Sequence, residues 1–123
     1  MVVGLGTDII EVERIDGALK RGGDKLLSHL FTLEEQHYCL AHRHAARHFA
    51  GRFAAKEAIL KAWGKGLTEG VTWLQISLLN DAHGKPFAKL TDPLASYLQG
   101  YRLMISISHC HKYATATALL ITL

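Results

Sequence analysis

The 123-residue sequence lacks the features that mark disulfide-stapled, disordered or membrane-spanning proteins. Its two cysteines, Cys39 and Cys110, show neither a CxxC motif nor the spacing of a zinc site, which favours reduced thiols in a cytoplasmic protein. The presence of only two prolines, with no low-complexity tract or internal repeat, argues against a linker or a repeat array. No apolar run approaches the ~18 residues that span a bilayer, so no membrane segment is expected.

The amino-terminal stretch also lacks a targeting signal. MVVGLGTDII is apolar, but no basic segment precedes it and Asp8 follows almost at once. What the chain does have is 49% hydrophobic residues, enough for one core, and we expect a single domain over residues 1–123. Its net charge of +3 is compatible with an acidic protein partner, a phosphate-bearing ligand or nucleic acid, and equally with no functional meaning.

Hydrophobic periodicity and turn residues predict an α+β fold, an antiparallel sheet with helices inserted after its first strand. Strands are expected over residues 2–8, 71–80, 87–91, 103–108 and 113–123. Helices are expected over residues 11–21, 33–44, 47–63 and 93–99. We expect the first strand to be buried, and a domain this small can complete its core by oligomerising.

Local signals mark several element boundaries. Thr32 and Glu35 have the spacing of a capping box at the start of the second helix. Gly64 follows the third helix in a position that favours a left-handed cap. Gly84 supplies a turn residue with positive φ, and Asp92 is expected to cap the short fourth helix ahead of a proline.

The third predicted helix carries an unusual charge pattern. Its sequence GRFAAKEAILKAWGKG, residues 51–66, places one carboxylate, Glu57, among several cations. Glu57 and Lys61 lie one turn apart on the same face, so they can act on one ligand. The alternative is an ordinary surface pair worth about 0.3 kcal/mol.

Asp8 is the second candidate carboxylate, at the end of the first predicted strand. This position should lie at a sheet edge, where sites tend to form, although Asp8 could instead cap the following helix. Carboxylates from separate elements, with Lys61 near one of them, suit Mg²⁺ bridging phosphate oxygens. A lysine then acts as a point charge on phosphate, and the other cations of the third helix would hold further phosphates.

Three segments of the chain together resemble one enzyme family. They are GLGTDIIEVERI at residues 4–15, FAGRFAAKEAILKAWGKGL at 49–67, and GKP with ISISHCHKYATATALL at 84–86 and 105–120. Their order and spacing cover nearly the whole chain and resemble the holo-acyl-carrier-protein synthases, the small bacterial 4'-phosphopantetheinyl transferases. The resemblance implies transfer of the phosphopantetheine arm of coenzyme A to a serine of apo-acyl carrier protein, in support of fatty acid biosynthesis. It also implies Mg²⁺ dependence, release of adenosine 3',5'-bisphosphate, and a homotrimer with active sites between subunits.

The resemblance also implies roles for individual residues. Asp8 and Glu57 match the metal ligands, and Lys61 matches the lysine at the pyrophosphate, so these three are the expected catalytic residues. Further residues match positions that bind coenzyme A: Arg43, Arg52, Lys61, Gly84, Lys85, Pro86 and His109. Arg14 and Arg21 match positions that meet the acidic recognition helix of the carrier protein. Because they are seven residues apart on a helix, these two arginines share a face.

Two positions depart from the family pattern. Met104 stands where many members have a histidine, just before the fourth predicted strand's ISIS segment, and this bears on how the 3'-phosphate is held. His83 stands where the adenine loop often has an asparagine. Neither departure touches the expected metal ligands, so activity should survive.

Two other functions compete with this one. The segment HYCLAHRHAARH contains an i,i+4 pair, His44 and His48, that could share a zinc ion, but no complementary Cys/His cluster with the usual spacing occurs elsewhere. A nucleic-acid-binding module could use the cationic stretch from Arg43 to Lys56. The neighbouring aromatics Phe49 and Phe53 fall on the apolar side, however, rather than on an exposed stacking platform, and no nucleic-acid-binding motif is present.

Overall fold

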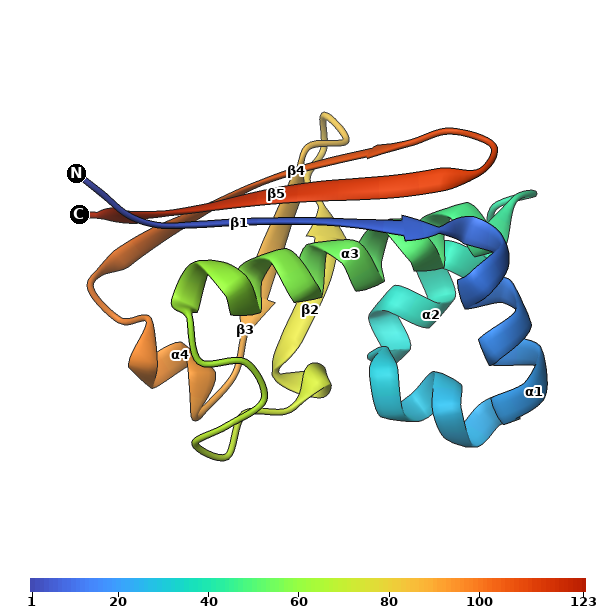
Figure 1. Cartoon of the computed structure of the whole chain (residues 1–123), viewed down its shortest axis with the longest axis horizontal. Helices are drawn as coiled ribbons and strands as arrows, with labels where there is room; N and C mark the ends of the chain where they lie inside the picture. The colour runs from blue at the N-terminus through green and yellow to red at the C-terminus, as the bar shows by residue number, and fades with distance from the viewer.

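A three-stranded antiparallel sheet lies over a layer of helices, with a separate two-stranded hairpin beside them (Figure 1). The computed structural model describes all residues, 1–123. In chain order the elements are β1 (Val2–Glu11), α1 (Val12–Leu30), α2 (Leu33–Leu40), α3 (Ala45–Trp63), a 3-10 turn η1 (Trp73–Gln75), β2 (Ile76–Asn80), β3 (Pro86–Leu90), α4 (Leu94–Tyr97), β4 (Tyr101–His109) and β5 (Tyr113–Thr122). The larger sheet has the order β1-β5-β4, so the first and last strands of the chain pair and both termini lie at one end (Figure 1).

The α+β prediction is confirmed, and the local signals marked the boundaries well. Thr32 and Glu35 form the expected capping box, and Gly64 ends α3 in a left-handed conformation with φ of 94°. Gly84 has φ of 82° in the β2–β3 turn. The Asp92 carboxylate accepts hydrogen bonds from the backbone N–H and the hydroxyl of Ser96 in α4, but the N-cap residue of this helix is Pro93, one residue later than expected.

The three largest differences from the predicted boundaries lie in the first two helices and the second strand. The helix stops at Gly23 (φ 60°), as expected from the glycine pair, but a second helical segment continues to Leu30. The predicted helix 33–44 ends at Leu40. The predicted strand 71–80 begins only at Ile76, because the Gln75 amide donates back to Thr72 and so makes a 3-10 turn instead of a strand ladder.

Small residues let α3 lie directly against β1. A side chain on Gly6 would collide with the carbonyl of Ala58, and one on Gly4 would collide with the carbonyl of Ala62. Alanines on β5 and on α3 are fully buried in the same layer: Ala54, Ala55, Ala58, Ala114, Ala116 and Ala118. This close approach of backbone to backbone fixes the position of α3 on the sheet.

Helix α3 crosses the sheet obliquely. Its carboxy-terminal half lies on β1 through Ala58 and Ala62, whereas a side chain on Gly51, nearer its amino terminus, would lie 3.0 Å from Ile107 on β4. One helix therefore reaches both edge strands of the sheet, its carboxy-terminal half at β1 and its amino-terminal half at β4.

The other face of the sheet has no covering layer within the chain (Figure 1). Side chains alternate along β1, so Leu5 and Ile9 point away from α3 and are 64% and 67% exposed. Met104 on β4 and Tyr113 on β5 are also exposed. The prediction that the first strand is buried was therefore wrong for most of its residues, since only Gly6 is fully buried and only one face of this sheet is packed within a single chain.

A buried ion pair connects the helices to the hairpin. Lys56 and Glu35 are both 0% exposed, and Lys56 Nζ lies 2.6 Å from Glu35 Oε1. Lys56 also donates to the carbonyl oxygens of Leu30 and Trp73, and Glu35 accepts from the backbone N–H of Leu78. Burial lowers the pKa of Lys56, and the neighbouring Glu35 opposes that shift. Lys56 is thus a structural residue, not one of the phosphate-binding cations expected from the sequence.

The contact between β1 and α3 generates a stability prediction. Gly6→Ala should destabilise the protein by about 2 kcal/mol or more, because the added methyl meets backbone that cannot move aside. Gly17→Ala on α1 is the matched control, since its methyl would meet only the tip of the Arg21 side chain and alanine is about 1 kcal/mol better than glycine inside a helix. Urea unfolding of both variants measures the difference. A Gly6→Ala protein as stable as the Gly17→Ala protein would contradict this packing.

Candidate functional site

The packing of α3 on β1 brings Asp8, Glu57 and Lys61 together. Asp8 follows Gly4 and Gly6 on the face of β1 that meets α3, and Glu57 and Lys61 immediately precede the two alanines that those glycines contact. Lys61 Nζ lies 3.1 Å from Asp8 Oδ1 and 3.0 Å from the carbonyl oxygen of Thr7. The sequence placed these residues on separate elements, and the structure makes them neighbours.

The alternative roles weighed for these residues are not observed. Asp8 does not cap α1, whose N-cap residue is Glu11 and carries no side-chain cap bond. Lys61 makes its ion pair with Asp8 on another element, not with Glu57 one turn away on its own helix. The cluster is therefore a tertiary one, and not an ordinary pair on a helix surface.

The electrostatics of this cluster favour a bound cation. The pKa of Glu57 is raised, first by burial and then by the negative charge of Asp8, while Lys61 acts in the opposite direction. A positive charge bound beside Glu57 would favour its ionised form. No group of three or more His, Cys, Asp or Glu side chains suited to a metal occurs in the chain. An ion held by Asp8 and Glu57 would take its remaining ligands from water or phosphate, which suits Mg²⁺.

A second cluster surrounds Arg52 beside β4. Arg52 is only 4% exposed, its guanidinium donates to Asn80 Oδ1 at 2.5 Å, and it lies 3.9 Å from the centre of the Tyr38 ring. Its Nε is buried without a hydrogen-bond partner. A buried cation with an unused donor and no carboxylate partner is suited to an anionic ligand.

This cluster lines a pocket of about 200 Å³. The lining residues come from α2, α3, the β2–β3 hairpin and β4, and they are Tyr38, His48, Gly51, Arg52, Asn80, Gly84, Pro86, Ile107 and His109. Four residues expected at the coenzyme A site are thus brought together, namely Arg52, Gly84, Pro86 and His109.

The remaining expected residues lie outside this pocket in the single chain. Arg43 is exposed in the turn between α2 and α3, and Lys85 is exposed in the hairpin turn, where its backbone N–H binds Asp81. Arg14 and Arg21 are both exposed on the first segment of α1, before its break at Gly23. Both side chains are therefore exposed to solvent in the single chain.

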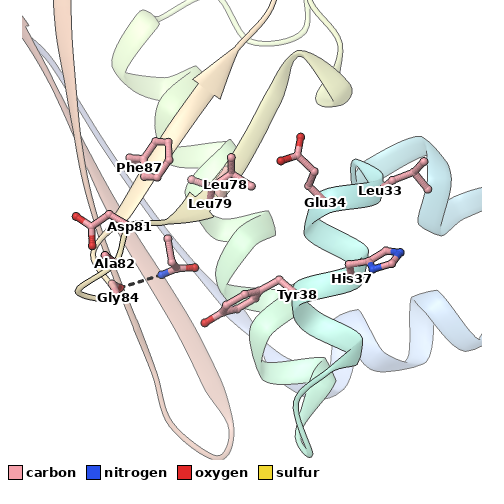
Figure 2. A pocket seen from close by; sticks show the side chains of 11 residues that line it. Leu33, Glu34, His37, Tyr38, Leu78, Leu79, Asp81, Ala82, Gly84 and Phe87 are labelled. Carbon is pink, nitrogen blue, oxygen red and sulfur yellow. Dashed lines mark hydrogen bonds between the residues drawn. The ribbon is translucent and has the colours of Figure 1, made fainter.

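A larger hollow adjoins the small pocket. It has a volume of about 920 Å³ between α2 and the β2–β3 hairpin, and it shares Tyr38, Asn80 and Gly84 with the small pocket. Figure 2 shows Tyr38 on α2 facing the hairpin residues across this hollow, with the Leu78 and Phe87 side chains on the hairpin side. Sequence reasoning missed Tyr38 and Asn80, because nothing local distinguishes them and only the fold places them beside Arg52.

Neither alternative function finds a site in this structure. The cationic stretch expected for nucleic acid is interrupted, because Arg52 and Lys56 are buried. The histidines of the proposed zinc site form no metal-binding group with other ligands. None of the helices combines the length and the apolar character that crossing a bilayer requires.

Comparisons with known proteins find similar chains over nearly the whole length of this one. The family model described as the 4'-phosphopantetheinyl transferase superfamily matches residues 4–118. The holo-acyl-carrier-protein synthase of Protochlamydia amoebophila is 50% identical over 118 residues, covering 96% of this chain and 97% of that protein. The holo-acyl-carrier-protein synthase structure from Neisseria meningitidis superposes with a TM-score of 0.89 at 32% identity, covering 98% of each chain.

A ligand-bound structure is also similar. The crystal structure of the holo-acyl-carrier-protein synthase from Bacillus anthracis, in complex with coenzyme A (3',5'-ADP), gives a TM-score of 0.85 at 34% identity and covers 100% of this chain and 99% of that chain. The family model, the sequence relative and the similar structure all indicate the same family. This chain belongs to the 4'-phosphopantetheinyl transferase superfamily, within its holo-acyl-carrier-protein synthase family.

Proposed function

We propose that this single-domain chain transfers the 4'-phosphopantetheine group of coenzyme A to a serine hydroxyl of apo-acyl carrier protein. The observation that carries the proposal is the Asp8–Glu57 carboxylate pair with Lys61 beside it, in a chain of this family. In the reaction the serine oxygen bonds to the phosphorus that bears pantetheine. The bond from that phosphorus to the bridging oxygen breaks, and adenosine 3',5'-bisphosphate leaves. The acyl carrier protein becomes the holo form used in fatty acid biosynthesis.

Asp8 and Glu57 would hold Mg²⁺ in this reaction. When bound, the ion polarises the phosphate under attack and offsets the two carboxylate charges. The Lys61 ammonium, now 3.1 Å from Asp8, is close enough to turn to the leaving phosphate and stabilise its developing charge. Either Glu57 or a water molecule at this site would accept the serine proton.

Arg52 and its pocket would hold the 3'-phosphate of coenzyme A. The unused Nε of Arg52 and the neighbouring His109 supply donors, and Gly84 and Pro86 form the wall where the adenine would lie. Arg43 and Lys85 would contribute further charge at the rim. Arg14 and Arg21 would receive the acidic carrier protein, and this attraction should weaken as salt rises.

We further propose a homotrimer in the cytoplasm, with active sites between subunits. The uncovered sheet face carrying Leu5 and Ile9 supports association with further copies, since exposed apolar patches of this kind mark interfaces. The free thiols of Cys39 and Cys110 fit a reducing compartment.

The two clusters lie at opposite edges of the sheet within one chain, both on the face that α3 covers. Asp8 pairs with Ala116 of β5, which in turn pairs with Ile107 of β4, so a whole strand separates them. Neither the pocket around Arg52 nor the adjoining hollow includes Asp8, Glu57 or Lys61. A second copy that places its Arg52 pocket beside Asp8 would complete the site, with metal ligands from one subunit and the phosphate pocket from its neighbour.

The transferase proposal predicts a metal-dependent mass gain on the carrier protein. Purified apo-acyl carrier protein, incubated with this protein, coenzyme A and Mg²⁺, should gain one phosphopantetheine arm by intact mass spectrometry. EDTA, Asp8→Asn and Glu57→Gln should each abolish the gain, and Lys61→Met should lower kcat by about 100-fold. Asp24→Asn, an exposed carboxylate on α1, is the matched control and should remain active. Full activity in EDTA, or in the Glu57→Gln protein, would refute the assigned metal site.

The oligomer proposal predicts a single assembly of three chains. Light scattering should give three times the chain mass, and Leu5→Asp or Ile9→Asp should shift the protein to monomer, because a buried unpaired charge at an interface is costly. Leu67→Asp changes an equally apolar exposed residue in the loop after α3 and should leave the trimer intact. A monomeric wild-type protein that retains full activity would overturn this part of the proposal.

A further inference from the structure

Three histidines from different parts of the chain stack beside Arg52. The His42 and His48 ring centres are 4.0 Å apart, and those of His48 and His109 are 5.2 Å apart. His42 comes from the turn after α2, His48 from α3 and His109 from the end of β4. The Tyr38 ring contacts both His42 and His48, at 4.5 and 5.6 Å between centres. The stack is therefore a tertiary feature, brought together by the same packing that forms the Arg52 pocket.

The stack borders the pocket directly. His48 and His109 both line it, on the side of α3 and β4, together with Arg52. His42 Nδ1 donates to the carbonyl oxygen of Tyr38 at 2.7 Å, which fixes the orientation of the ring at the outer end of the stack. His48 and His109 thus share the pocket wall with the buried Arg52, whose Nε has no hydrogen-bond partner.

Every charged or titratable group that acts on His48 is basic. These groups are His42 in the preceding turn, His109 on β4, and Arg47 and Arg52 on its own helix. Arg47 is itself directed to His111, with Nη2 2.7 Å from Nδ1 of that ring. Helix α2 contributes the phenol ring of Tyr38 to the pocket. The β2–β3 hairpin contributes the neutral residues Asn80, Gly84 and Pro86. No carboxylate compensates this concentration of basic groups.

The free protein consequently keeps His48 neutral. Burial, followed by the influence of His42, His109, Arg52 and Arg47, lowers the pKa of His48 to about 4. A dianionic phosphate in the pocket would add the negative charge that this environment lacks. Because an opposite charge nearby favours the protonated imidazole, the pKa of His48 must rise when phosphate binds.

We propose that His48 is a proton-linked phosphate ligand, which takes up a proton as the phosphate group of a nucleotide enters the Arg52 pocket. This inference rests on the proposed function, under which the phosphate is the 3'-phosphate of coenzyme A. His42 and His109 hold the His48 ring at the pocket wall, and His109 shares the phosphate with Arg52. The stack thus supplies a titratable hydrogen-bond donor at the phosphate subsite. Met104, which stands where many family members have a histidine, is exposed on the uncovered sheet face.

The direction of the pH effect follows from linkage. A proton bound in the complex but absent from the free protein makes affinity increase as pH falls, by up to about tenfold per pH unit. This gain applies between the raised pKa of His48 in the complex and its value of about 4 in the free protein. The second ionisation of a phosphate monoester near pH 6 acts in the opposite direction, since it removes ligand charge below that pH. The informative window is therefore about pH 6 to 8.

Isothermal titration calorimetry with coenzyme A tests the proposal. Wild-type protein should bind coenzyme A more tightly at pH 6.5 than at pH 8, and titrations at pH 7 in buffers of different ionisation enthalpy should show proton uptake. His48→Phe, which keeps a ring in the stack, and His48→Gln, which keeps a polar side chain, should both lose most of this pH dependence. 3'-Dephospho-coenzyme A should show none of it with any of these proteins. His29→Gln, which removes an exposed histidine at the end of α1, is the matched control and should behave as wild type.

The outcomes separate this inference from the proposed function. If His48→Phe and His48→Gln bind coenzyme A with the same pH dependence and proton uptake as wild type, the inference is wrong even though transfer to the carrier protein persists. The inference also fails if 3'-dephospho-coenzyme A shows the same proton uptake as coenzyme A, because the linked proton would then belong to another part of the ligand. If coenzyme A binds at no pH, the proposed function itself fails.

Discussion

The close contact between α3 and β1 determines where the functional side chains of this chain lie. Gly4 and Gly6 admit the backbone of α3 at Ala62 and Ala58, and each alanine immediately follows a charged residue of the site. A larger residue at either glycine would lift the helix away from the strand and separate Asp8 from Glu57 and Lys61. The alanines of α3 thus fill the core and also position the site. Their small side chains let the helix approach β1 closely enough to bring Glu57 beside Asp8.

The oblique course of α3 also divides the site into two halves. Its carboxy-terminal half presents Glu57 and Lys61 beside β1, and its amino-terminal half presents Arg52 and His48 beside β4. The buried Lys56–Glu35 pair between these halves connects α3 to α2 and to the hairpin that forms the far wall of the Arg52 pocket. One helix therefore contributes to both halves, and the uncovered sheet face supplies a surface on which copies could bring the halves together.

The sequence predicted the elements whose signals are local and missed what depends on the fold. The capping box at Thr32 and the glycine cap at Gly64 depend on a few adjacent residues, and both were found. Lys56 was grouped with ligand-binding cations because of its charge, although its spacing from Arg52 and Leu60 already placed it on the buried face of α3.

Other contacts within the site had no local signal in the sequence, even where the residues themselves were predicted. The ion pair of Lys61 with Asp8 joins residues more than fifty positions apart, and periodicity within one helix could indicate only its neighbour Glu57. The edge-to-face contact of His48 with His109 is a similar case, because it joins α3 to the end of β4, far along the chain. The exposure of one face of β1 depends on how many layers cover the sheet, which alternation alone does not reveal.

The most direct test of this account mixes two inactive proteins. Glu57→Gln removes the metal half and Arg52→Gln removes the phosphate half, and each variant alone should be inactive at limiting coenzyme A. When the two are co-expressed and assembled at random, roughly one quarter of the sites between neighbouring subunits should contain both intact halves, and activity should return to about that level. No recovery in mixed trimers, with each variant confirmed as folded and trimeric, would show that both halves serve the same chain and would contradict the account.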